Sequence, residues 1–359
     1  MLSNLEDRIN LQSKTLNAVK MLMILFVIFI HMNPTTERCG EVAMWWHSIV
    51  VVAVPVFFII SGYFFFYNVK EFNSFVYVTK LKKRGRTLLT PYLLWNLLPV
   101  FMIVGGNLFS IIFRGKSFDA LCSFFYGLWD EGLWHIWWDK TSGTMPFDSP
   151  LWYVRDLIIV VCLSPIIYWL IKRIGLLFSI IIGILYVSGL WPNVTGLSPT
   201  AYLFFSIGAT YALKNRLMIN MPRKMKYILL ILALVFFILQ NVESVPIVNR
   251  LFIIISSLLW IVGFSHLPDK VINIVSKYVS SVFFIYAIHN TFVLANTSKI
   301  LLWLVDEKVC YWISPLITMM LCMAAYFLLK KILPRFTAFI CKYNVVNSCD
   351  CVYSNDKSK

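Results

Sequence analysis

The segment LNAVKMLMILFVIFIHM, residues 16–32, decides the class of fold. Apart from Asn17, Lys20 and His31 it is apolar throughout, and its length approaches the roughly 20 residues that an α-helix needs to cross a bilayer. Similar runs recur along all 359 residues, and only 14% of the chain is charged, against about 25% in a typical soluble protein. The sequence therefore predicts a membrane protein.

Ten runs of this kind can be counted, and they are continuous rather than alternating, which favours helices over strands. The predicted spans are residues 16–32, 43–66, 88–113, 151–171, 174–190, 201–213, 227–240, 251–264, 279–294 and 310–329. We expect an all-α, polytopic membrane helical bundle of about ten transmembrane helices. The first run lacks a small-residue cleavage site, so it is expected to stay as a helix rather than be removed as a signal peptide.

The distribution of basic residues predicts the orientation of these spans. With both termini in the cytoplasm, 24 of the 32 Lys and Arg residues fall in inside segments and seven fall outside. Such a bias is typical of cytoplasmic loops. We expect a cytoplasmic N-terminal segment over 1–15, a membrane domain over 16–333 and a cytoplasmic tail over 334–359. The longest outside loop, 114–150, is rich in Trp and is expected to lie partly in the membrane interface.

The formal net charge of +15 could suggest nucleic acid as a partner. The cations lie between apolar runs, however, where they orient a membrane protein, so the expected partner is the lipid bilayer and not nucleic acid. The cysteines and histidines show no metal-ligand spacing, and no metal site is expected. Ser61-Gly62-Tyr63 is interpreted as close helix packing rather than as the turn of a catalytic serine.

Ionisable groups within spans are candidates for function because the bilayer makes them costly. His31 lies at the outward end of the first span and could act as a general base, or could be an interfacial residue bonded to a neighbouring helix. Lys20 lies eleven residues earlier, about three turns deeper on the same helix face.

Three further places carry polar groups. Arg84-Gly-Arg86 could bind phosphates through guanidinium forks or could be a positive-inside anchor. Arg155 and Asp156 start the fourth span and could form an ion pair that fixes packing. His289 could be functional or could bridge helices.

Several short sequence motifs, including the polar positions above, occur along the chain in a recognisable order. The marks are His31, Pro55-Val-Phe-Phe-Ile-Ile-Ser-Gly-Tyr63, Arg84-Gly-Arg86 before Pro91-Tyr92, Leu151-Trp-Tyr-Val-Arg-Asp-Leu157, Ser206-Ile-Gly208 and Val282-Phe-Phe-Ile-Tyr-Ala-Ile-His289. In this order, over residues 16–333, the chain resembles the acyltransferase 3 family of bacterial membrane acyltransferases.

The resemblance implies a multi-pass protein of the bacterial cytoplasmic membrane. It would transfer an acyl group, usually acetyl from acetyl-CoA, to a hydroxyl of a cell-surface polysaccharide or lipid-linked glycan. It implies no bound cofactor, since acyl-CoA is a substrate. By the resemblance, His31 is catalytic and Arg84 and Arg86 bind acyl-CoA. Many members carry Asp-x-x-Arg eleven residues before the histidine, whereas this chain has Asn17 and Lys20, which keeps the positive charge without the forked geometry.

Supporting roles are open for Lys20, Arg155, Asp156 and His289, and the last three could orient His31 or bind the acceptor. Two alternative functions are also compatible with a multi-span membrane protein. A transporter or flippase for a polar lipid or glycan would also hold charges in the membrane. A polysaccharide ligase or polymerase would normally need a larger outer loop than residues 114–150.

Overall fold

The structure is a computed structural model of the chain, and it describes residues 2–139, 145–192, 194–243 and 245–341. Within these ranges the chain forms helices and connections without any strand. The α-helices are α1 (Leu2–Ile30), α2 (Thr36–Cys39), α3 (Glu41–Val50), α4 (Ala53–Phe66), α5 (Ser74–Arg84), α6 (Thr90–Arg114), α7 (Asp119–Glu131), α8 (Trp152–Cys162), α9 (Ser164–Ile174), α10 (Leu176–Ser188), α11 (Pro199–Leu213), α12 (Arg223–Val242), α13 (Pro246–Gly263), α14 (Asp269–Ser276), α15 (Val282–Ile288), α16 (Ala295–Leu301), α17 (Glu307–Ile332) and α18 (Pro334–Ile340). Two π-helical turns (Gly85–Leu89 and His289–Leu294) and four short 3₁₀ turns (Leu133–Ile136, Ser149–Leu151, Phe264–His266 and Val279–Ser281) join some of them.

Seven helical segments of the described residues are long and apolar enough to cross a membrane, or eight if a bent pair counts as one span. The seven are Ile9–Ile30, Glu41–Phe66, Ser74–Arg114, Arg223–Val242, Pro246–His266, Asp269–Leu301 and Glu307–Ile332, and the bent pair is Ser149–Cys162 with Ser164–Ile174. The predicted all-α polytopic membrane bundle is therefore confirmed.

The predicted count of about ten spans is not confirmed. All ten predicted segments are helical, but the fifth and sixth correspond to α10 and α11, of 13 and 15 residues. A 15-residue helix reaches about 22 Å, short of the roughly 30 Å hydrocarbon core. The cytoplasmic location of the termini stays a prediction, and the predicted tail beyond residue 341 lies outside the described residues.

Helices α4 and α11 form the centre of the bundle, and they pack against each other along their length. Glycines allow this close approach: a Cβ on Gly62 would overlap the carbonyl oxygen of Phe205, and one on Gly208 would overlap that of Ile59. Small residues let membrane helices approach in this way. The interpretation of Ser61-Gly62-Tyr63 as a packing element is confirmed.

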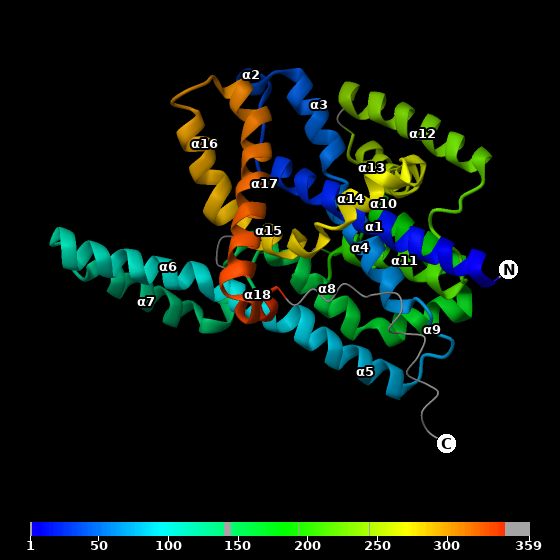
Figure 1. Cartoon of the computed structure of the whole chain (residues 1–359), viewed down its shortest axis with the longest axis horizontal. Coiled ribbons are helices and arrows are strands. Elements are labelled where there is room, and N and C mark those ends of the chain that lie inside the picture. Colours follow the sequence, from blue (N-terminus) through cyan, green and yellow to red (C-terminus); the bar gives the residue numbers. More distant parts are fainter. Residues whose placement is uncertain (1, 140–144, 193, 244, 342–359) are drawn as a thin grey trace.

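Helix α1 is also largely buried and runs through the middle of the body (Figure 1). Near its C-terminal end, Phe26 and Phe29 pack edge-on against Trp46 of α3, with ring centroids 5.5 and 5.6 Å apart. Phe29 also lies 5.8 Å from the ring of Tyr311 on α17. These contacts fix the end of α1, where His31 follows Ile30.

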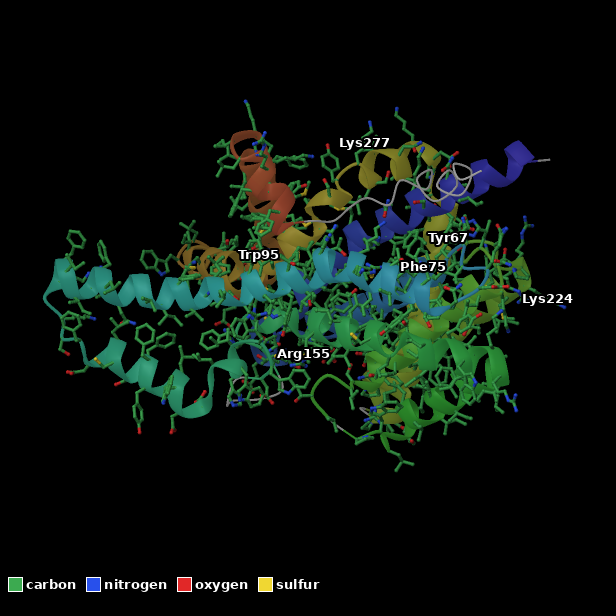
Figure 2. The ribbon with its side chains drawn as sticks, turned by 90° about the horizontal axis from the view of Figure 1, so that it is seen from below. Tyr67, Phe75, Trp95, Arg155, Lys224 and Lys277 are labelled. Atoms are coloured by element: carbon green, nitrogen blue, oxygen red, sulfur yellow. The ribbon has the colours of Figure 1, made fainter. Side chains whose placement is uncertain are left out.

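Two backbone irregularities change or preserve the direction of the chain between helices. The chain bends by 62° between α8 and α9, where Pro165 lies in the first turn of α9 and cannot donate a backbone hydrogen bond to the preceding turn. By contrast, the π-helical turn Gly85–Leu89 joins α5 and α6 into one 41-residue segment (Figure 2).

The C-terminal part of α6 and the neighbouring α7 extend beyond the rest of the molecule (Figures 1 and 2). Helix α7 occupies residues within the predicted outer loop 114–150 and packs beside α6. This loop therefore contains a 13-residue helix, and its location in the membrane interface stays a prediction.

Candidate active site

A cavity of about 200 Å³ lies between α1, α4, α5, α8 and α15. It opens beside α5, where the lining residue Lys83 is exposed. Its lining includes the cations Lys20, Lys80, Lys83 and Arg84, the apolar residues Phe57, Ile60, Phe64, Leu157, Val282 and Phe283, and the hydroxyl-bearing residues Ser61, Thr87, Tyr153 and Tyr286. None of the described lining residues is acidic, so the cavity favours an anion with an apolar portion.

The cations are positioned by helix geometry. Lys80, Lys83 and Arg84 follow an i, i+3, i+4 spacing, which gathers them on one face of α5. The Nζ of Lys80 and the guanidinium of Arg84 lie 5.4 and 5.9 Å from the ring centroid of Phe65. Aromatic faces attract cations at such distances, and the contacts keep both groups at the cavity.

Lys20 brings a fourth cation from α1. Its side chain is 7% exposed, and its Nζ lies 4.9 Å from the ring centroid of Phe64 and 3.3 Å from Oδ1 of Asn17. Lys20 and Arg84, which the sequence singled out separately, thus line the same cavity.

Arg86 is placed differently from Arg84. It is exposed and is not among the cavity-lining residues. Two residues within the π-helical turn correspond to nearly half a revolution, so the two side chains leave the helix on opposite sides. The structure therefore does not bring the two arginines together.

Two tyrosines line the interior of the cavity. The hydroxyl of Tyr153 lies 3.1 Å from Oγ of Ser61, and the hydroxyl of Tyr286 donates to the carbonyl oxygen of Pro150. Their ring centroids are 5.8 Å apart. The ring of Tyr286 also lies close to that of His289.

A row of rings leads from the cavity to His31. The ring centroid of His289 lies 6.0 Å from that of Tyr286 and 5.1 Å from that of His31. His31 is partly buried one residue past α1, whereas His289 is fully buried. The structure therefore brings together the two histidines that the sequence singled out 258 positions apart.

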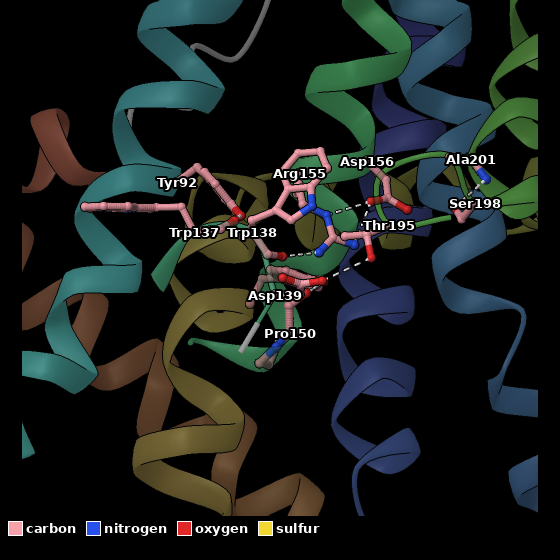
Figure 3. A network of polar contacts seen from close by, with 11 residues as sticks. Tyr92, Trp137, Trp138, Asp139, Pro150, Arg155, Asp156, Thr195, Ser198 and Ala201 are labelled. Atoms are coloured by element: carbon pink, nitrogen blue, oxygen red, sulfur yellow. Dashed lines mark hydrogen bonds and ion pairs between the residues drawn. The ribbon is translucent and has the colours of Figure 1, made fainter. Parts of the chain in front are cut away.

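Arg155 and Asp156 form a buried ion pair on α8, with Nη2 of Arg155 3.0 Å from Oδ1 of Asp156 (Figure 3). Arg155 also donates to the carbonyl oxygen of Trp138, and its guanidinium lies 5.7 Å from that ring. Asp156 accepts hydrogen bonds from Ser198. The ion pair therefore holds the connections that contain Trp138 and Ser198 against α8. These contacts favour a role in packing.

Sequence reasoning missed a buried carboxyl group, Asp148, which precedes the bent span. Its Oδ1 accepts a hydrogen bond from Oγ1 of Thr291 at 3.0 Å, and its backbone N–H donates to Oδ1 of Asn96 at 3.0 Å. Burial raises the pKa of Asp148 to about 7, and the bond from Thr291 offsets part of that effect. No motif marks this residue, because its burial depends on α6 and on the turn His289–Leu294.

Sequence reasoning also missed the cavity roles of Lys80, Lys83, Tyr153 and Tyr286. The i, i+3, i+4 spacing of the α5 cations was a signal that could have separated Lys80 and Lys83 from ordinary loop cations. The tyrosines offered no comparable signal, because they occur within apolar runs that read as packing.

The fold is that of an integral membrane helical bundle, and its cavity can hold an anionic, partly apolar molecule near a pair of histidines. Residues 13–330 match the family model described as an acyltransferase domain, which covers most of the chain. The chain belongs to this acyltransferase 3 family, and its described residues include several helices long and apolar enough to cross a membrane.

A search of curated proteins gives a partial match. The chain is 26% identical over 175 residues to the succinoglycan biosynthesis protein ExoH of Rhizobium meliloti (strain 1021). The match covers 45% of this chain and 44% of that relative, so it spans less than half of each. No solved structure matches the chain.

Proposed function

We propose that the chain transfers an acyl group, with acetyl favoured, from acyl-CoA to a hydroxyl of a cell-surface polysaccharide or its lipid-linked precursor. It would do so in the bacterial cytoplasmic membrane, with CoA on the cytoplasmic side. The acceptor class is supported by the family and by the name of the partial relative, a succinoglycan biosynthesis protein. No bound cofactor is required, because acyl-CoA is consumed as a substrate.

One observation carries the proposal: a cavity lined by four cations and no described acidic residue leads inward to tyrosines beside a histidine pair. CoA is an anion whose phosphates suit lysine and arginine, and its pantetheine arm suits a narrower, less charged channel. Lys20 lies on α1 and His31 directly follows its last residue, so the two are eleven residues, or about 16 Å, apart. The donor would therefore span from the cations to the neighbourhood of His31.

In this proposal the phosphates of the donor contact Lys20, Lys80, Lys83 and Arg84, and the thioester lies near His31. Arg86, at the exposed surface, would act on the approaching donor through its charge. Tyr286 lies between the cavity and the histidines, so the thioester would have to pass beside its ring.

The chemical step is an exchange of acyl partners. His31 takes the proton of the acceptor hydroxyl, the oxygen attacks the thioester carbonyl carbon, and the carbon–sulfur bond breaks. The departing CoA thiolate then receives a proton, so an ester and free CoA are formed. A variant in which His31 is first acylated itself has the same balance, and both routes need an uncharged imidazole.

Mass spectrometry of cell-envelope glycans tests the proposal and names its unknowns. Cells that express the chain should carry a glycan heavier by one acyl group than the same glycan from cells that lack it. The mass difference identifies the acyl group, and fragmentation identifies the acceptor. Identical glycan profiles, with the protein present in the membrane, would overturn the proposed acceptor class.

A further inference from the structure

The imidazole of His289 is held in one tautomer. Its Nδ1 lies 2.8 Å from the carbonyl oxygen of Tyr286 and 3.1 Å from that of Ile285. A carbonyl oxygen only accepts hydrogen bonds, so Nδ1 must carry the proton. In a neutral imidazole the other nitrogen, Nε2, is then an acceptor.

This acceptor is buried and unused. Nε2 of His289 has no hydrogen-bond partner among the residues that the structure describes. Buried polar atoms are normally paired, and an exception calls for an explanation. His289 also begins a π-helical turn, His289–Leu294, a local widening that is frequent at functional sites.

His31 is the polar neighbour that can supply the missing donor. The two ring centroids are 5.1 Å apart, and the rings are tilted by 56°. At that separation, imidazoles that meet edge to edge bring their nitrogens to hydrogen-bond distance. His47 on α3 is a second titratable group near His31.

Several other polar groups of this region are engaged elsewhere in part or in full. Oδ1 of Asp148 accepts from Thr291, Asp156 is paired with Arg155, and the hydroxyl of Tyr286 donates to Pro150. Oδ2 of Asp148 and Nδ1 of His47 also lack a hydrogen-bond partner among the described residues. The ring of His289, however, lies directly against that of His31, with their centroids 5.1 Å apart, so its free acceptor is the one the geometry favours.

We propose that His289 is a positioning residue for His31: its Nε2 accepts the N–H of one imidazole nitrogen of His31 and leaves the other nitrogen unprotonated to act as the base. This inference rests on the proposed acyl transfer. It deepens that proposal by assigning the group that sets the tautomer and ring orientation of the base.

The step remains balanced with this assignment. The acceptor hydroxyl gives its proton to the free nitrogen of His31, and its oxygen forms the ester bond as the carbon–sulfur bond of the thioester breaks. The resulting imidazolium is stabilised by its hydrogen bond to neutral His289, and it then returns one proton to the CoA thiolate. His289 gains and loses no proton.

Two substitutions separate this role from packing. In His289→Asn the amide can replace the Nδ1 donor but has no atom at the position of Nε2, whereas in His289→Gln the amide oxygen can replace the Nε2 acceptor. Inverted membrane vesicles supply native acceptors, and release of CoA from acetyl-CoA reports the reaction. The enzyme-dependent rate is the part absent from His31→Ala vesicles.

We expect His289→Asn to lower the rate at saturating acetyl-CoA by roughly 10- to 100-fold, by analogy with the loss seen when groups that orient metal-bound histidines are removed, with little change in KM for acetyl-CoA. His289→Gln should retain several-fold more activity than His289→Asn. Equal losses in both variants, or a loss that appears only in KM, would assign His289 to packing and overturn the inference. A wild-type rate no higher than that of His31→Ala would instead refute the proposed transfer itself.

A second measurement compares the wild-type protein with His31→Ala and needs no variant of His289. Solid-state ¹⁵N NMR of the histidine-labelled protein in lipid should show His289 with protonated Nδ1 and a hydrogen-bonded, unprotonated Nε2. The Nε2 signal should shift in His31→Ala, while the Nδ1 signal should not. A protonated Nε2, or a signal indifferent to His31, would contradict the inference.

Discussion

Arg84 and Arg86 are two positions apart in the chain, yet they occupy different surroundings. Arg84 lines the cavity and lies over the ring of Phe65, whereas Arg86 is exposed. The sequence could predict a basic cluster but not this difference, because it depends on the π-helical turn that begins at Gly85. Neighbouring lysines of α5 repeat the pattern, since Lys83 lines the cavity and Lys82 does not.

This difference gives a matched test of donor binding. Arg84→Gln should raise KM for acetyl-CoA by roughly 10- to 100-fold, because hydrogen bonds to charged groups contribute about 1.5–3 kcal/mol. Arg86→Gln, the matched control, should change KM much less. Lys83→Gln and Lys82→Gln form a second pair with the same expected order, measured as CoA release from acetyl-CoA. Equal effects within each pair would show that the cavity does not bind the donor.

The buried carboxyl of Asp148 makes stability depend on pH. Burial raises its pKa from 3.8 to about 7, so the folded state holds the proton more firmly than the unfolded state does. The resulting stabilisation is complete below the unfolded value and is lost as the pH rises through the folded value.

Thermal unfolding of the purified protein should therefore show a larger fall in Tm from about pH 5 to about pH 8 for wild type than for Asp148→Asn. The asparagine keeps an oxygen that can accept from Thr291 but does not ionise. Asp119→Asn, which alters an exposed carboxylate of α7, is the control and should leave the pH dependence of wild type unchanged. An unchanged pH dependence in Asp148→Asn would contradict the assignment.

At the scale of elements, the crossing of α4 and α11 holds the centre of the bundle. Gly62→Ala should lower the Tm clearly, because its Cβ would meet the backbone of Phe205, which cannot rotate away as a side chain would. Overpacking of this kind typically costs about 1–3 kcal/mol or more. Gly105→Ala is the matched control: nothing lies within 4 Å of the added Cβ, so it should leave the Tm unchanged or raise it. Similar Tm values for the two variants would mean that the helices are less tightly apposed.

The Arg155–Asp156 ion pair is a second stabilising feature at this scale, because it holds the connections that contain Trp138 and Ser198 against α8. Arg155→Met should destabilise the protein by about 3–5 kcal/mol, since it leaves a buried carboxylate without its partner. The double variant Arg155→Met/Asp156→Leu should be less destabilised than the sum of the single variants. A double-mutant cycle from unfolding curves measures the coupling, and strictly additive effects would show that the pair does not act as a unit.

Much of the element scale could be predicted from the sequence. Each of the ten apolar runs is helical, because within a bilayer the backbone N–H and C=O groups must hydrogen-bond to each other rather than to water. The number of complete spans could not be predicted, since it depends on the shortness of α10 and α11 and on the bend before Pro165. For the site, Lys20, His31, Arg84 and His289 carried chemical signals, whereas the contact between His31 and His289 arises only when α1 packs near the turn His289–Leu294.

At the scale of the whole molecule, the cations and the histidines occupy different depths along α1. Lys20 lies at the cavity with the α5 cations, and His31 lies eleven residues farther along the helix. With the predicted orientation, the donor would enter from the cytoplasm and the ester would form toward the opposite face. This direction of transfer is the central claim of the proposed function.

Transfer of label from acetyl-CoA tests this claim most directly. Inverted membrane vesicles expose the cytoplasmic face, so acetyl-CoA labelled in its acetyl group can be supplied there and the glycan fraction counted afterwards. Wild-type vesicles should incorporate label into glycan, and vesicles with equal amounts of membrane-inserted His31→Ala should incorporate none above the background of vesicles without the chain. Equal labelling by wild type and His31→Ala, or no glycan labelling by wild type, would contradict the account.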